Sequence, residues 1–378
     1  MGTRFHLGWI SWLAASLCGA ACGQQAQEPA CQRAGCEGAL LCEVPEDPGS
    51  RGPWPVGART VSLAGLTAEF WYPARFGSQD DAAQVVYDVR TQLPAEERAK
   101  IPDSDNPYQT CDCYRDLPID EARGPYPLVV FFHGTAAFRS QSLDLCTHLA
   151  SRGFVVLAAD HPGLRLADAL GLAGIESDLP GDAAAMLAAL AAPEGECAFL
   201  EGELALDRVG LIGHSAGGRA AGQATGLPGV RASVPMAYEG AEPGPLLEAL
   251  LVLGAQDDAV VPYERQQAGY EASPAPKHLV GIANAGHLAF SDLCAMTNAD
   301  GQDLVEIAVE HGVTNAELAL LLWDGCGEGQ TSPEQGWAIV DYASAAIFEQ
   351  ALTCRAGPDP LAEIEDRFSL VAEHRCDP

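Results

Sequence analysis

The feature that most constrains the fold is a regular alternation of two patterns from Pro127 onward. Continuous apolar runs such as 127–132 and 154–160 alternate with segments of helical periodicity such as 141–153 and 182–192. A strand that is apolar along its whole length has both faces covered, and strands separated by helices pair in parallel. We therefore predict an α/β fold with a mostly parallel, doubly wound sheet and helices on both faces. Further apolar runs follow at 208–212, 232–237, 249–254 and 278–283.

Length and charge restrict the partners of the chain. Its 378 residues, 48% of them hydrophobic, are enough to bury a large core. The formal net charge of −31 argues against nucleic acid, whose phosphates bind Lys and Arg, and against adsorption to anionic lipid. An acidic surface of this kind is typical of an exported protein that stays in solution.

The first 22 residues are typical of an export signal. Arg4 precedes an apolar run at 7–22 that is too short and too poorly flanked for a membrane span. The small residues Gly19 and Ala21 permit cleavage just before Cys22. A lipoprotein signal is cut at the same bond, and Cys22 then carries a lipid that tethers the protein to the membrane. Ordinary cleavage and lipidation both remain open.

The rest of the chain divides by composition. Residues 23–50 are polar, contain cysteines and lack periodicity, which predicts a linker, and 51–378 form the main domain. At its start, two β-type runs flank Gly65 and predict a hairpin. We expect an irregular insert at 76–125 and a helical insert at about 297–335.

Cysteine usage indicates an oxidising compartment. Of thirteen cysteines, Cys18 leaves with the signal, and the remaining twelve could form six disulfides. Lipidation of Cys22 would leave an odd number. Neither the Cys-Asp-Cys at 111–113 nor the spacing of the earlier cysteines matches a zinc site, so we expect disulfides and no metal. The pairing stays open.

The stretch Arg208–Gly222, RVGLIGHSAGGRAAG, carries the clearest chemical signal. Val209–Ile212 predict a strand, and the small residues after Ser215 predict a helix that lies close to the sheet. A serine at such a sharp turn has a strained backbone and an exposed hydroxyl, and Gly213 and Gly217 leave room for it. The free N–H groups of the helix N-terminus would face a developing oxyanion. We predict that Ser215 is a nucleophile.

A serine nucleophile needs a base and a group that orients the base. The strand at 249–254 is followed by Asp257 and Asp258, and the strand at 278–283 by His287. Parallel strands bring these loops to one edge of the sheet. We therefore predict His287 as the base, with one of the two aspartates beside it.

Two backbone N–H groups are expected to bind the oxyanion. The strand at 127–132 ends in a His133-Gly134 loop. Gly134 lets the backbone turn so that the N–H of Thr135 faces the site opposite that of Ala216. Loss of one such donor typically costs ~3 kcal/mol of transition-state stabilisation.

Several stretches together resemble a known family: GPWPVGARTVSL…AEFWYPA, VVFFHGTAAFRSQS…LASRGFVVLAADHPG, RVGLIGHSAGG and GHLAFSD. They are similar to the dienelactone-hydrolase-like branch of the α/β hydrolases, to its platelet-activating-factor acetylhydrolase type, and more distantly to bacterial polyester hydrolases. The resemblance runs from about Gly52 to Asp292. It implies an α/β-hydrolase fold and a carboxylic ester hydrolase with a Ser-Asp-His triad and no cofactor.

The resemblance also bears on the acid. In one hydrolase pattern the acid comes three residues after a glycine, and counting from Gly254 gives Asp257. In other related sequences the acid comes four residues before a proline, here Pro262, or four residues after the glycine. Both of these counts give Asp258. We take Asp258 as the residue that orients His287. The inserts depart from the family, and such loops usually build the acyl pocket. The aromatic candidates for that pocket are Trp71, Phe138 and Phe290.

The sequence as a whole predicts a bacterial serine esterase that is secreted, periplasmic or lipid-anchored at the cell envelope. Its substrate would be a small-molecule, lipid or polymeric ester. A catalytically silent surface binding protein on the same fold is the alternative from another class. Hydrolysis of thioesters or peptides by the same residues is the alternative within enzymes.

Overall fold

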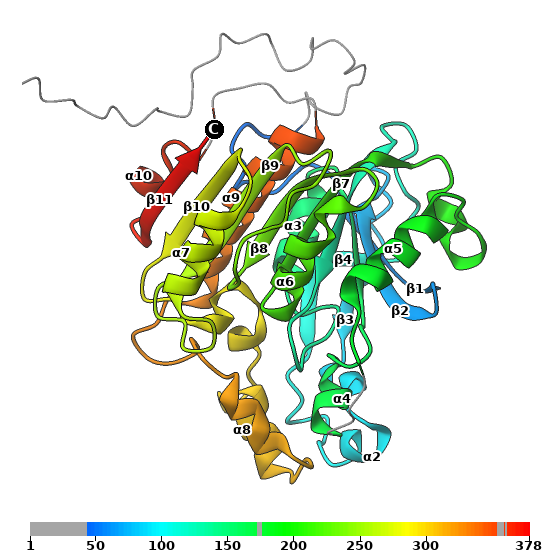
Figure 1. Cartoon of the computed structure of the whole chain (residues 1–378). Helices are drawn as coiled ribbons and strands as arrows, with labels where there is room; N and C mark the ends of the chain where they lie inside the picture. The colour runs from blue at the N-terminus through cyan, green and yellow to red at the C-terminus, as the bar shows by residue number, and fades with distance from the viewer. Residues whose placement is uncertain (1–43, 172–175, 354–358, 360) are drawn as a thin grey trace, which may run out of the picture.

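The computed structural model describes residues 44–171, 176–353, 359 and 361–378 (Figure 1). The predicted signal at 1–22, with Cys22, and most of the predicted linker lie outside these residues. Residues 44–50 lie against the body of the protein, where the Arg152 guanidinium donates to the backbone oxygens of Pro45 and Asp47 at 3.0 and 3.1 Å. The end of the predicted linker is therefore attached to the main domain.

Eleven strands form one sheet in the order β11-β10-β9-β8-β7-β5-β6-β2-β1-β4-β3. From β10 to β6 every neighbouring pair is parallel, as the apolar runs predict. The chain passes from β5 to β6 and then returns to the other side of β5 with β7. This reversal creates a crevice at the carboxyl ends of β5 and β7, the usual position of a ligand site in such sheets. The parallel strands are β5 (Tyr126–Phe132), β6 (Val155–Ala159), β7 (Leu204–His214), β8 (Val230–Met236), β9 (Ala249–Ala255) and β10 (Lys277–Ile282).

Helices cover both faces of the sheet, also as predicted. Along β5, Val129 and Phe131 face one apolar cluster, while Leu128, Val130 and Phe132 face the other. On the first face lie α3 (Leu143–Ser151) and the long α9 (Pro333–Leu352), and on the second α5 (Leu179–Leu190) and α6 (Ala216–Gln223). The helix α7 (Tyr263–Ala272) packs on β9 and β10.

The antiparallel strands extend the sheet at its two edges. The predicted hairpin consists of β1 (Val56–Leu63) and β2 (Leu66–Pro73), with its turn at Ala64-Gly65. Its second strand, β2, pairs with β6. At the other edge, β11 (Val371–Asp377) pairs with β10. The apolar pattern did not predict β11, because its residues are mostly polar and half-buried.

The insert at 76–125 is not irregular throughout, which corrects the sequence prediction. It adds β3 (Gln84–Tyr87) and β4 (Gln109–Arg115) to the sheet, and β4 pairs in parallel with β1. The inward positions of β4 are Gln109, Cys111 and Cys113. A glutamine and two cysteines give no apolar alternation, which is why the pattern hides this strand.

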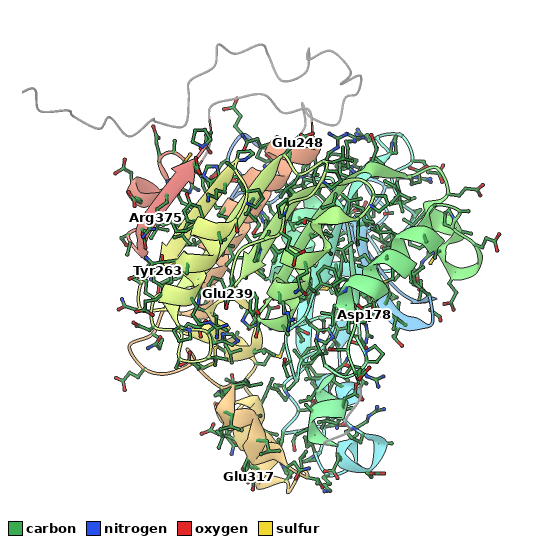
Figure 2. The ribbon with its side chains drawn as sticks, viewed as in Figure 1. Asp178, Glu239, Glu248, Tyr263, Glu317 and Arg375 are labelled. Atoms are coloured by element: carbon green, nitrogen blue, oxygen red, sulfur yellow. A yellow bond between two sulfur atoms is a disulfide. The ribbon has the colours of Figure 1, made fainter. Side chains whose placement is uncertain are left out.

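The inserts also form a projection beyond the carboxyl ends of the strands (Figure 1). Its helices are α2 (Ala95–Arg98) and α8 (Leu304–Glu310) from the inserts and α4 (Leu166–Leu170), which follows β6. Ala316–Leu321 is a 3-10 helix. Glu317 marks its outer end in Figure 2. Residues of both inserts share one apolar cluster, so the inserts pack on each other. Its members are Leu93 and Ile101 of the first insert, Ile307, Val313 and Ala316 of the second, and Leu170 of α4.

The cysteines follow the prediction only in part. Cys111–Cys113 and Cys294–Cys326 are disulfides, and Cys376 is also disulfide-bonded. Cys146 and Cys197 are buried free thiols, so of the open alternatives the pairing of all twelve mature cysteines does not occur. Burial raises the pKa of the Cys146 thiol, which therefore stays protonated. In the described ranges, no helix has the length and apolarity needed to span a bilayer.

Candidate active site

The turn between β7 and α6 holds Ser215 in a strained conformation. Its backbone has φ 57° and ψ −119°, a region that residues with a side chain seldom adopt. A Cβ on Gly213 would lie 2.3 Å from the Gly217 carbonyl oxygen, and one on Gly217 would lie 2.1 Å from the Phe132 carbonyl oxygen. Only glycine therefore allows the helix to start so close to the strands. The Ser215 side chain stands at the carboxyl edge of the sheet and is partly exposed.

The structure brings Asp258 and His287 into direct contact. Asp258 Oδ2 lies 2.9 Å from His287 Nδ1, and both side chains are buried. Asp258 Oδ1 accepts the N–H groups of Val260 and Val261 at 2.9 and 2.7 Å, and Gln266 Nε2 donates to Oδ2 at 3.0 Å. These bonds fix the carboxylate, which in turn fixes which imidazole nitrogen carries the proton.

The neighbouring aspartate lies in a different environment. Asp257 is exposed, and its backbone N–H donates to the Ala285 carbonyl at 2.9 Å. The geometry therefore favours Asp258 over Asp257 as the partner of His287, in agreement with the proline spacing rather than the shorter count from glycine.

The loop after β5 lies against the serine turn. A Cβ on Gly134 would lie 3.4 Å from Ser215 Cβ, so the backbone of the loop approaches the serine closely. Within the described ranges, the backbone N–H groups of Thr135 and Ala216 make no hydrogen bond. Thr135, in the loop after β5, and Ala216, at the start of α6, thus each leave a backbone donor free near Ser215, and an oxyanion site requires free donors.

Sequence reasoning missed two buried residues that join these loops. Gln141 Oε1 accepts the Gly134 N–H at 2.8 Å, and its Nε2 lies 2.8 Å from His214 Nδ1. His214 Nε2 lies 2.7 Å from the His287 carbonyl oxygen, which can only accept, so Nε2 donates and Nδ1 accepts. Burial, and then the proximity of His287, lower the pKa of His214 to about 3. No motif marks Gln141, and His214 occupies the variable position of the turn.

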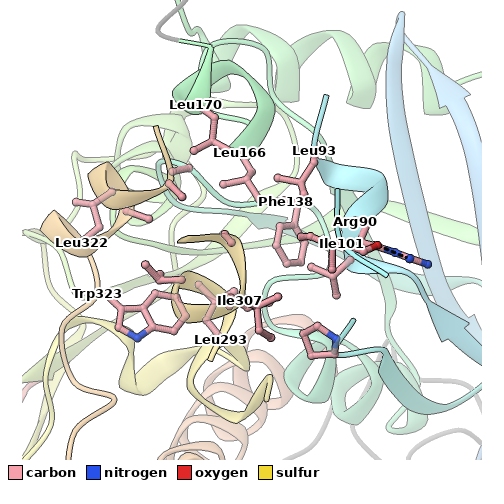
Figure 3. Close-up of a pocket in the computed structure, with 18 of the residues that line it drawn as sticks. Arg90, Leu93, Ile101, Phe138, Leu166, Leu170, Leu293, Ile307, Leu322 and Trp323 are labelled. Atoms are coloured by element: carbon pink, nitrogen blue, oxygen red, sulfur yellow. Dashed lines mark hydrogen bonds between the residues drawn. The ribbon is translucent and has the colours of Figure 1, made fainter. Parts of the chain in front are cut away.

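A largely apolar pocket opens beside the site (Figure 3). Thr135 and Leu288, the neighbour of His287, lie on its wall, and the space between its walls is about 870 Å³, including the part open to solvent. Both inserts contribute to the lining, as expected for a substrate pocket. Apolar residues from the inserts include Val89, Leu93, Ile101, Leu304, Ile307, Ala316, Ala319, Leu322 and Trp323.

Of the three aromatic residues expected in the pocket, one lines it. Phe138 is part of the pocket wall and points into it in Figure 3. Trp71 and Phe290 belong instead to the apolar core on the α3 and α9 face of the sheet. The prediction that Trp71 and Phe290 line the pocket is wrong, because an aromatic residue next to a buried segment has the same sequence surroundings in a core as in a pocket.

The comparison with known families agrees with this picture. A family model described as platelet-activating factor acetylhydrolase, isoform II, matches residues 106–164. The match spans β4, β5, the Thr135 loop, α3 and β6, and it ends before Ser215. Together with the mostly parallel sheet and its helices on both faces, the match identifies the fold as the α/β-hydrolase fold. The resemblance to this acetylhydrolase type is thus confirmed over that segment and favours a hydrolase, while Ser215, Asp258 and His287 lie outside the segment. A search of curated proteins finds no match to the chain.

One group of side chains in the described residues has the spacing of a metal site. His278, Asp359 and Cys376 have ligand atoms within 4.8 Å of one another. Cys376 is in a disulfide and offers no thiolate. His278 is the second residue of β10, at the opposite end of that strand from the loop that carries His287. This group therefore gives no argument for a metal in the reaction.

Proposed function

We propose that the protein is an exported serine hydrolase that cleaves carboxylic esters through an acyl-enzyme intermediate. One observation carries the proposal: a strained serine turn after β7 occurs together with a hydrogen-bonded aspartate and histidine after β9 and β10. The family match over 106–164 supports it independently, because the description of that family names an acetylhydrolase.

In the first half of the reaction, Ser215 Oγ attacks the carbonyl carbon of the ester. His287 accepts the hydroxyl proton on Nε2, while Asp258 accepts a hydrogen bond from Nδ1 and stabilises the imidazolium. The N–H groups of Thr135 and Ala216 bind the negative oxygen of the tetrahedral intermediate. When the intermediate collapses, His287 returns the proton to the leaving alcohol, and the acyl group remains on Ser215.

In the second half, water replaces the alcohol. His287 removes a proton from the water as it attacks the acyl carbon, and the same two N–H groups bind the new oxyanion. The bond to Ser215 Oγ then breaks, and His287 donates its proton to the serine oxygen. The carboxylic acid leaves, and the enzyme has its original protonation. No cofactor takes part.

The pocket supports an ester with an apolar portion as the substrate. Its walls are mainly aliphatic, and Thr135 lies at the boundary between the pocket and the proposed oxyanion site. An apolar group in this pocket would therefore leave the ester carbonyl near Ser215. The strongly negative chain disfavours substrates of high negative charge.

Export is part of the proposal. The disulfides Cys111–Cys113 and Cys294–Cys326 are typical of an oxidising compartment. Fractionation of cells that produce the full chain tests the anchor. Release of Cys22→Ser into the soluble fraction would support a lipid tether, whereas an unchanged soluble distribution would support ordinary cleavage.

A panel of p-nitrophenyl esters from acetate to decanoate tests the activity. We expect turnover by the wild-type protein and nearly none by Ser215→Ala. Absence of ester turnover by the folded wild-type protein would favour the silent binding protein. Faster cleavage of matched thioesters or peptides would change the substrate class.

A further inference from the structure

We propose that Asp324 is a positioning residue for the base His287, and that it transmits the conformation of the pocket wall to the catalytic loops. The inference rests on the proposed function and goes beyond it, because Asp324 lies in the insert at 297–335, outside every motif of the site. Asp324 is half-buried and follows directly after the pocket residues Leu322 and Trp323.

The Asp324 carboxylate joins the loop of the acid to the loop of the base. Its Oδ2 atom accepts the backbone N–H of His287 at 2.8 Å and the backbone N–H of Ala259 at 3.0 Å. Ala259 is the residue after Asp258. The Asp324 carbonyl oxygen also accepts the N–H of Leu288 at 2.8 Å. One residue of the insert thus holds three amides beside the Asp258–His287 pair.

A glycine contact brings this segment against the base loop. A Cβ on Gly286 would lie 2.5 Å from Gly325 Cα and 2.9 Å from Asp324 Oδ2, and a Cβ on Gly325 would lie 2.8 Å from Gly286 atoms. Gly325 also has φ +97°, a conformation that favours glycine. The two backbones therefore touch directly at the residue before His287.

The same segment is attached to the pocket on both sides of Asp324. Cys326 forms a disulfide with Cys294, seven residues after His287. Trp323 lines the pocket, and its indole N–H donates to Asp303 Oδ2 at 2.8 Å, at the start of α8. A displacement of this pocket wall would therefore move the acceptor of the His287 N–H.

Loss of the Asp324 carboxylate should misplace the base rather than weaken binding. Two amides would lose their acceptor, and the loops after β9 and β10 would be free to move apart. A displacement of about 1 Å at a reacting group can cost about 10²-fold in rate. Asparagine keeps one oxygen acceptor at this position, so it should restore part of the rate that alanine loses.

The experiment compares Asp324→Ala, Asp324→Asn and a matched control, Glu328→Gln, an exposed acidic residue in the same segment. The measurements are kcat and KM for p-nitrophenyl butyrate, the thermal midpoint, and amide hydrogen exchange at 258–261 and 286–289. We expect kcat to fall about 100-fold in the alanine variant with KM within about threefold. The asparagine variant should be intermediate, and the control should match the wild-type protein.

Two results would overturn the inference. The first is a folded Asp324→Ala protein in which both kcat and KM are unchanged. The second is a folded Asp324→Ala protein with unchanged kcat and a raised KM, which would make Asp324 only part of the pocket wall. If the wild-type protein cleaves no ester, the proposed function fails by itself. Hydrogen exchange then decides the positioning role, because unchanged exchange around His287 in the alanine variant would refute the contact's importance.

Discussion

The sheet and the two inserts supply different parts of the same site. Ser215, Asp258 and His287 follow β7, β9 and β10, whose positions next to the turns are completely buried. The inserts are built from short elements held together by capping boxes, ion pairs and the Cys294–Cys326 disulfide. The comparison supports a proposed division in which the sheet carries the reacting residues, while the inserts line the pocket and contact the catalytic loops through Asp324.

The sharpest test of this division is to remove the nucleophile. Ser215→Ala should lower kcat by at least ~10⁴-fold while the protein folds normally, because the variant lacks the hydroxyl that attacks the ester in the proposed reaction. Ester turnover and circular dichroism of the purified variant check this. A variant with wild-type turnover would move the nucleophile away from the β7 turn.

The next largest effect separates two neighbouring acids on the same strand end. Asp258→Asn should lower kcat by ~10³–10⁴-fold, since asparagine favours the wrong imidazole tautomer. Asp257→Asn, at the exposed neighbour, is the matched control and should change kcat by less than about twofold. The reverse pattern in folded proteins would assign the acid to Asp257.

The sequence predicts the sheet well because its strands are continuous apolar runs between helices. The serine turn was recognisable because glycine at 213 and 217 is needed for the close approach of strand and helix. The strand β4 was hidden because glutamine and cysteine occupy its inward positions. Long-range contacts had no local signal at all: the Gln141–His214 bond joins residues 73 apart, and the Asp324–His287 bond joins residues 37 apart.

The pocket-lining residues of the inserts should control the preference for acyl chain length. Ala319 lines the pocket, whereas the adjacent Leu320 is exposed. Ala319→Phe should lower kcat/KM for p-nitrophenyl decanoate about tenfold relative to acetate, because the added ring occupies space that a long acyl chain needs. Leu320→Phe should leave the ratio unchanged. Equal ratios in both variants would exclude this pocket as the acyl site.

Buried histidines in and beside the sheet should also make the free energy of unfolding depend on pH. Burial lowers the pKa of His133 to about 4, of His148 to about 4 and of His214 to about 3, against an ordinary value of 6.5. Unfolding then takes up protons below pH 6.5. The contribution of each of these histidines to the free energy of unfolding should therefore fall by ~1.4 kcal/mol per pH unit as the pH decreases from 6.5 toward 4.

Urea unfolding at several pH values measures this slope. His148→Gln removes one titrating group far from the serine turn and should reduce the slope by about one histidine's share. The half-buried His311, at the end of α8 in the projection, is the comparison: the same substitution there should change the slope less. An equal change in both variants would contradict the role of the buried histidines.

Covalent labelling with a fluorophosphonate probe tests the central claim most directly, because only an activated serine reacts and the physiological ester need not be known. The account predicts a single adduct on the peptide that contains Ser215, located by mass spectrometry. The adduct should be absent in Ser215→Ala and strongly reduced in His287→Ala. A folded wild-type protein without an adduct, or with the adduct on another serine, would contradict the account.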